Sequence, residues 1–183
     1  MSNNNNENSI LFGAGELFVL PDSVDLDEST EEEIEEAMLK IGESSGESTL
    51  NYTQEFYDVR GGVGNDILAS FVTSEEVMFN AGVCTLDMKV LNEISSTYYN
   101  EDESKRTLGI GGKRTVPVKQ MLFVHTKRQD GKKLKLKMYR AQNRSGLQLT
   151  FNPTAESVFN FEFKLLSDPS KTNGNIVKIV EEI

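Results

Sequence analysis

Residues 49–96 read TLNYTQEFYDVRGGVGNDILASFVTSEEVMFNAGVCTLDMKVLNEISS and decide the fold. This stretch predicts two strands, Leu50–Val59 and Ile67 to about Cys84, because β-branched and aromatic side chains suit a pleated sheet. The glycines and the asparagine between them favour a turn. Apolar residues of the second strand recur at every second position, at Val77, Phe79, Ala81 and Val83. That period of two indicates a strand with one buried face.

A short helix is predicted directly after these strands. Thr85 stands where an N-cap residue is expected, because its hydroxyl can accept a hydrogen bond from the first helical turn. The apolar residues that follow fall on one helical face, at Leu86, Val90, Leu91 and Ile94. We expect this face to pack on the sheet formed by the strands before it.

A hairpin is predicted in the second half of the chain. Val116–Lys127 and Lys132–Ala141 flank an Asp-Gly pair, which is a strong hairpin signal between two strands. In the second arm the apolar Leu134, Leu136 and Met138 are expected to face the core. The opposite face then carries Lys133, Lys135, Lys137 and Tyr139 and is expected to be solvated or paired.

Other strands are predicted from the same patterns. The most pronounced alternation of apolar and polar residues places Phe159, Phe161, Phe163 and Leu165 on one face, as in a main core strand. Shorter strands are expected at Glu16–Leu20, Leu108–Gly112, Leu147–Phe151 and Asn175–Glu181.

An acidic helix is predicted near the start of the chain. Ser29 or Thr30 can cap it, with Glu32 or Glu33 completing a capping box. The apolar stripe Ile34, Ala37, Met38 and Ile41 extends this helix to Gly42, where we expect it to stop. A flexible loop is then expected over Glu43–Ser48.

These segments predict one α+β domain that is mainly β. Several short antiparallel strands with one or two short flanking helices indicate a β-sandwich or a partly closed barrel. The 183 residues suit a single domain, placed at 10–183, with the acidic helix and loop inserted at about 22–48. Residues 1–9 are polar and of low complexity, which predicts a disordered arm.

Charge is divided unequally along the chain. Residues 1–104 hold 23 acidic and 3 basic residues, whereas residues 105–183 hold 6 and 16. This division either pairs two faces of one molecule or joins the acidic surface of one subunit to the basic surface of another. A single cysteine, no apolar run of about 20 residues and a start without signal-peptide features predict a protein made and kept in a reducing cytosol, without a membrane segment.

No motif in the sequence predicts a catalytic residue, a metal site or a cofactor. His125 is the only histidine and lies in a predicted strand, so a nucleophilic pair with Cys84 is disfavoured. The acidic run from Asp25 to Glu36 has EF-hand spacing but lacks the required glycine at position six, which favours a capped acidic helix. Gly109–Arg114 lacks the spacing of a phosphate-binding loop and is interpreted as a turn.

A basic set of residues offers the alternatives of a subunit contact or a DNA-binding stripe. Its members are Lys113, Arg114, Lys119, Lys127, Arg128, Lys132, Lys133, Lys135, Lys137, Arg140 and Arg144. Counterion release would let such a stripe bind DNA. A solvated face or a contact between subunits is favoured, because acidic residues are in excess elsewhere. The subunit-contact candidates are Lys133, Lys135, Lys137 and Arg140.

The order of the segments and their residue patterns resemble those of bacteriophage tail tube proteins, the major tail proteins. The segments concerned are FGAGELFVLP from Phe12, the long strand leading into TLDMKVLNEI, and FNFEFKLLSDP before the end. The resemblance extends from about Phe12 to Ile183. It implies hexameric rings whose strands form one continuous inner β-barrel, and rings that stack into the tube through which DNA passes to the host. The protein would then be made in the bacterial cytoplasm and reside in the virion tail.

The resemblance also implies partners and sites. The partners are other copies of the chain, the tape measure and tail terminator proteins, and in some tails a sheath. Residues that contact the next ring are expected in the loop Glu43, Ser44, Ser45, Gly46, Glu47 and Ser48. The hairpins Leu50–Cys84 and Val116–Ala141 are candidates for the lumen wall. Acidic groups that would let DNA slide are Glu55, Asp58, Glu75 and Glu76.

Two other functions stay open on the sequence. A tube protein of a DNA-free phage-tail-like particle or of a secretion system would share the same fold. A cytosolic DNA-binding β module is the remaining alternative, because of the basic set.

Overall fold

The computed structural model describes residues 14–85, 87–128, 130–148 and 157–183. Their elements in chain order are β1 (Gly15–Leu20), α1 (Glu31–Ala37), β2 (Leu39–Lys40), β3 (Ser44–Gly61), β4 (Asp66–Val83), α2 (Met88–Ile94), β5 (Thr97–Glu101), β6 (Arg106–Ile110), β7 (Val118–Thr126), β8 (Lys133–Asn143), β9 (Phe159–Leu165) and β10 (Val177–Glu181). The described chain is therefore mainly β with two short helices, as the sequence predicts.

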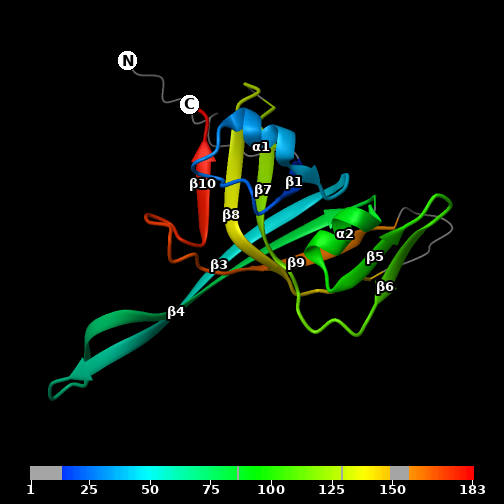
Figure 1. Ribbon diagram of the computed structural model, residues 1–183. Helices are drawn as coiled ribbons and strands as arrows, with labels where there is room; N and C mark the ends of the chain where they lie inside the picture. Colours follow the sequence, from blue (N-terminus) through cyan, green and yellow to red (C-terminus); the bar gives the residue numbers. More distant parts are fainter. Residues whose placement is uncertain (1–13, 86, 129, 149–156) are drawn as a thin grey trace.

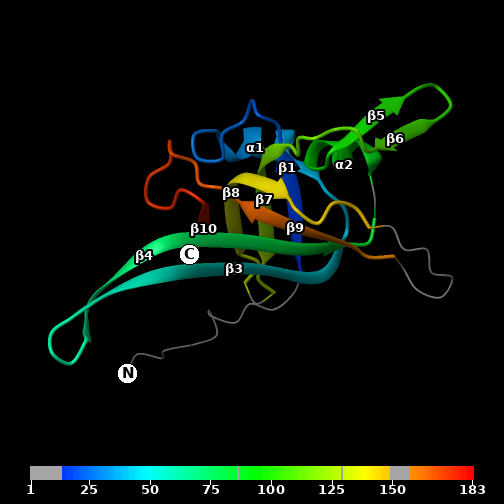
Figure 2. The same ribbon diagram turned by 90° about the horizontal axis from the view of Figure 1, so that it is seen from below.

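The main sheet is antiparallel and bends at β8. Its order is β2-β1-β7-β8-β9-β4-β3. One edge of β8 pairs with β7, whereas the other edge pairs with β10 along 134–138 and with β9 along 141–143. The divergence of β9 from β10 produces two layers, one of β2, β1, β7, β8 and β10, the other of β9, β4 and β3 (Figures 1 and 2). The sheet remains open, so the sandwich prediction is confirmed and the barrel is not closed.

The larger core lies between these two layers. The alternating residues Val77, Phe79, Ala81 and Val83 of β4 are all buried there, as are Phe159, Phe161, Phe163 and Leu165 of β9. Helix α2 joins this core through Val90, Leu91 and Ile94. Its N-cap is Asp87, whose side chain accepts from the amides of Lys89 and Val90, so the prediction of Thr85 is wrong. The hydroxyl of Thr85 instead accepts the Glu43 N–H at 2.8 Å.

A second, smaller core lies on the outer face of the β1–β7–β8 layer. Its members are Phe18, Leu20, Leu26, Ile34, Leu122 and Tyr139. Helix α1 supplies Ile34, and Thr30 and Glu33 form the predicted capping box. The helix ends at Ala37 and not at Gly42, because the chain beyond it pairs with the edge of β1 as β2.

The predicted flexible loop at Glu43–Ser48 is wrong, because β3 already begins at Ser44. Ser44 pairs with Val83 and Ser48 with Ala81, so the three residues between them form an irregular bulge. Gly46 adopts a φ of 107°, a conformation that glycine reaches without strain.

Two more differences concern short strands. Thr97–Glu101 forms β5, which pairs with β6 where the sequence predicted only the second arm. Leu147 and Gln148 are not in a strand, and the rest of the strand predicted at Leu147–Phe151 lies outside the described residues, as does the arm 1–9.

The hairpin of β3 and β4 projects from the body of the molecule. Both strands have 18 residues, but β9 pairs only with Val77–Val83 of β4. Beyond this point the two strands pair only with each other in the described chain and extend away from both layers (Figures 1 and 2).

Candidate functional site

The outer half of the β3–β4 hairpin exposes apolar side chains on both of its faces. Tyr57 lies opposite Phe71, and the adjacent residue Phe56 lies opposite Val72. Because neighbouring residues of a strand point to opposite faces, the two pairs lie on opposite sides of the hairpin. Their exposed fractions are 63%, 59%, 60% and 46%, in the same order. Such an exposed apolar surface is characteristic of an interaction site.

Local chemistry explains why the hairpin forms. Gly62 and Asn65 adopt positive φ angles of 77° and 53° in the turn. Cross-strand hydrogen bonds then join polar side chains, with Ser70 donating to Asp58 at 2.8 Å and Ser74 to Glu55 at 2.7 Å. An isolated two-stranded hairpin is marginal in water. Aromatic residues on both faces therefore favour a partner that covers this element.

All four candidate lumen carboxylates lie on this hairpin. Glu55 and Asp58 accept the serine hydrogen bonds, and Glu75 accepts a hydrogen bond from Tyr52, which lowers the pKa of Glu75. Glu76 forms an ion pair with Lys164 at 2.7 Å, and this hydrogen bond lowers its pKa. The structure thus brings the four residues onto one exposed element, and their position toward a lumen stays a prediction.

The lysines of β8 pair within the same chain. Lys133 lies 3.6 Å from Glu35, Lys135 binds Glu31, and Lys137 lies 3.5 Å from Asp27. Helix α1 and the segment before it therefore neutralise the face that the sequence left as solvated or paired. Three of the four basic candidates thus form ion pairs within one molecule, and their place in a subunit contact stays a prediction. Of the four basic candidates, Arg140 is exposed and donates to the Ser167 carbonyl at 2.8 Å.

A charged cluster around Asp27 completes this face. Burial raises the pKa of Asp27, but the Tyr139 hydrogen bond at 2.9 Å and the nearby Lys178 outweigh burial and leave the pKa lowered. Asp25 binds Lys171 at 2.8 Å, and this hydrogen bond lowers the pKa of Asp25. These carboxylates, which the sequence placed in an EF-hand-like run, are bound to ammonium groups. In the described chain no three His, Cys, Asp or Glu residues come together as a metal site.

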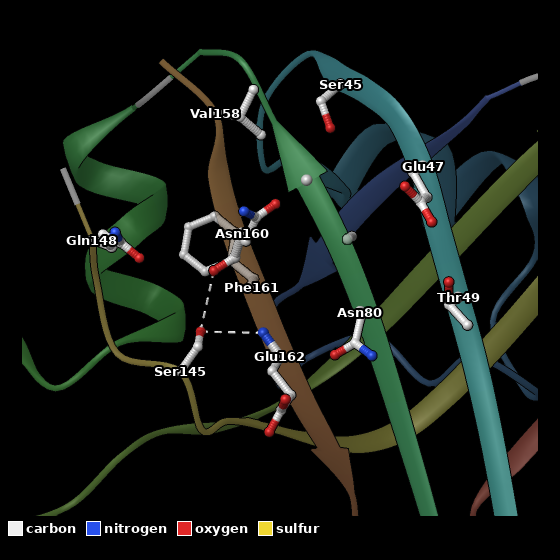
Figure 3. A pocket seen from close by; sticks show the side chains of 12 residues that line it. Ser45, Glu47, Thr49, Asn80, Ser145, Gln148, Val158, Asn160, Phe161 and Glu162 are labelled. Carbon is white, nitrogen blue, oxygen red and sulfur yellow. Dashed lines mark hydrogen bonds between the residues drawn. The ribbon is translucent and has the colours of Figure 1, made fainter. Parts of the chain in front are cut away.

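A polar groove lies on the outer side of β3, β4 and β9 (Figure 3). It measures about 630 Å³ and is lined by Ser45, Glu47, Thr49, Asn80, Ser145, Gln148, Asn160 and Glu162, among others. Ser145 accepts from the Glu162 N–H at 3.1 Å and donates to the Asn160 carbonyl at 3.3 Å. These bonds hold the segment after β8 against β9. Among the described residues that line the groove there is no histidine, cysteine or lysine, so its serines have no general base of that kind within this set.

His125 lies in β7 and is 5% exposed. Its Nδ1 is 3.2 Å from the Ala14 carbonyl, and its Nε2 is buried without a partner among the described residues. Cys84 follows β4 and does not line the cavity that contains His125. The structure thus gives no support to a pair formed by these two residues.

The exposure of the outer hairpin was not predicted from the sequence, although a signal was present. Phe56 and Tyr57 are adjacent, as are Phe71 and Val72. A strand with one solvated face alternates apolar and polar residues, whereas adjacent apolar residues indicate a strand that is covered on both faces. The bulge at Ser45–Glu47 carried no comparable signal.

No helix in the described part of the chain has the length and apolar character needed to span a membrane. Comparison with protein-family models and with curated proteins gives no match to this chain.

Proposed function

We propose that this protein is a structural subunit of a bacteriophage tail tube. Copies of the chain form a hexameric ring, and rings stack into a hollow tube that conducts genomic DNA to the host. The resemblance of the segments supports this function, and so does the mainly β sandwich with an open sheet. Tape measure and tail terminator proteins are the further partners that this function implies, with a sheath protein in those tails that contract.

The observation that carries the proposal is the projecting hairpin. It combines exposed apolar pairs on both faces with two strand edges that have no partner in the described chain, one along β3 and one along residues 66–76 of β4. Unpaired strand edges bind other strands. A contact between unlike surfaces of identical subunits closes into a ring or repeats along an axis, and a tube of stacked rings needs both.

The hairpin also fits a conduit for DNA. Its residues 51–75 carry the acidic Glu55, Asp58, Asp66 and Glu75 against the single basic Arg60. Fixed cations would hold phosphate groups, whereas a surface with an acidic excess lets DNA slide. This function needs no reaction, and we assign no catalytic residue.

Negative-stain microscopy of the concentrated protein tests the proposal. We expect rings or hollow rods from the wild-type chain. The double variant Tyr57→Ser, Phe71→Ser should stay monomeric, because it removes the apolar pair from one face of the hairpin. Ile110→Ser is the matched control and should assemble normally, because it removes an apolar side chain that is 69% exposed on β6, outside the hairpin. A wild-type chain that stays monomeric at every concentration and salt condition would rule out the function.

A further inference from the structure

An apolar groove opens between the two layers, beside the strands β3 and β10. One part of about 430 Å³ is lined by Leu50, Phe79, Phe123, Leu136 and Ile179, among others. A second part of about 290 Å³ adjoins it and shares Leu50 and Ile179. The groove thus continues from the core of the sandwich to the base of the projecting hairpin. Ile179 is 58% exposed at its rim.

Both strands that border this groove have a free edge. In the described chain β3 pairs only with β4, and β10 pairs only with β8. Each edge therefore presents backbone N–H and C=O groups that water satisfies in the single subunit. A site that combines an apolar floor with free strand edges fits another strand, which adds main-chain hydrogen bonds to the burial of apolar side chains.

We propose that this groove receives the outer half of the β3–β4 hairpin of a second copy of the chain. One arm of the incoming hairpin pairs with the free edge of β10 and extends that layer. One apolar face of the hairpin packs against Leu50 and Ile179. This inference rests on the proposed function, in which copies of the chain assemble. It adds the site on one copy that accepts the hairpin of the next.

The apolar surface on the hairpin contributes to such a contact. Besides Val63 in the turn, seven apolar residues of its outer half are exposed, namely Phe56, Tyr57, Val59, Ile67, Leu68, Phe71 and Val72. At about 100 Å² each, half of what an aromatic side chain buries in full, they supply roughly 700 Å² over both faces, so the one face that enters the groove supplies about half of this area. A stable interface removes about 600–1,000 Å² from each partner. The apolar face therefore supplies part of such an interface, and the main-chain pairing with β10 adds to it.

The hairpin that enters the groove has to come from another copy, because the groove and the hairpin of one chain share the strand β3. The first part of β3 forms a wall of the groove, and its continuation leads away from the body (Figure 2). A chain cannot fold its own hairpin back without breaking this strand. The contact is therefore heterologous, with a hairpin from one subunit and a groove from the next.

Mixing two variants tests this arrangement. Tyr57→Ser, Phe71→Ser removes the hairpin surface and leaves the groove, whereas Ile179→Asp places a charge in the groove and leaves the hairpin. Each protein alone should be monomeric. An equimolar mixture should form a complex of two chains and no longer species, because one intact hairpin meets one intact groove. Analytical ultracentrifugation measures the masses, and circular dichroism checks that each variant is folded.

Ile110→Asp on β6 is the matched control, because Ile110 is 69% exposed and lies on the small second sheet. This variant should assemble like the wild-type chain. If the wild-type protein forms hollow rods but the mixture of variants stays monomeric, the groove is not the acceptor site, and the proposed tube function still holds. If the mixture forms two-chain complexes but the wild-type oligomers are not tubular, the groove is the acceptor site and the proposed tube function is wrong.

Discussion

Phe79 and Phe123 meet edge to face across the sandwich, with ring centroids 5.2 Å apart and ring planes at 60°. Phe79 belongs to β4 and Phe123 to β7, so this contact joins the two layers. The strand that carries Phe79 also carries Phe71 on the projecting hairpin. One continuous strand thus anchors the candidate assembly surface in the core.

Replacing Phe79 by alanine should lower the free energy of unfolding by about 3–5 kcal/mol, because the change leaves a cavity at a fully buried position. Urea denaturation followed by circular dichroism measures this loss. Phe71→Ala removes the same side chain where it is 59% exposed and should change stability by about 0.5 kcal/mol or less. Equal losses in the two variants would show that the hairpin is covered within a single subunit.

Acid should destabilise the fold through the acidic residues that bind lysines. Asp25, Asp27 and Glu31 have lowered pKa values in the folded chain. Such groups stabilise the fold above their unfolded pKa of about 4, and this contribution disappears as pH falls through the lower folded pKa. The melting temperature should therefore decrease steadily below about pH 5.

The variant Asp27→Asn isolates the largest cluster on this face. It should melt at a lower temperature at neutral pH, because Tyr139 and Lys178 lose their charged partner. Its melting temperature should also vary less with acid than that of the wild-type chain. Glu32→Gln on the exposed side of α1 is the control and should keep the wild-type pH profile. An unchanged profile for Asp27→Asn would contradict the role of the cluster.

High salt should leave assembly intact. The lysines of β8 pair with acidic residues of their own chain, and the hairpin presents apolar side chains. At about 1 M salt the Debye length is about 3 Å, so contacts between charged subunit surfaces would be screened. Sedimentation at low and high salt measures the assembled fraction. Dissolution of the assemblies at high salt would instead support the contact between oppositely charged subunit surfaces.

Duplex DNA should bind weakly. Lys135 and Lys137 are largely buried beside Glu31 and Asp27, so they have few counterions to release. In a gel-shift titration at physiological salt we expect a Kd of about 10⁻⁶ M or weaker, the range of non-specific contacts under that condition. Tight binding would favour the DNA-binding module over a tube subunit.

Local patterns predicted most of the strands. The alternation of Phe159, Phe161 and Phe163 reports a buried face directly, and the Asp130–Gly131 turn identified the hairpin of β7 and β8. The helix predicted to reach Gly42 failed because Ile41 is required in the main core, where its N–H donates to the Leu17 carbonyl at 2.9 Å. A strand edge far away in sequence offered the backbone a better partner than another helical turn did.

The sequence alone determined the fold class, the main core strands and the division of charge, because each follows from side chains close together along the chain. Only the tertiary structure decided which charges neutralise one another, as with Lys178 and Asp27, which are 151 residues apart. It also decided that Phe56, Tyr57, Phe71 and Val72 are left uncovered. A pattern of apolar residues indicates that one face of a strand can be buried. Whether that face is buried depends on whether strands from distant parts of the sequence are long enough to cover it.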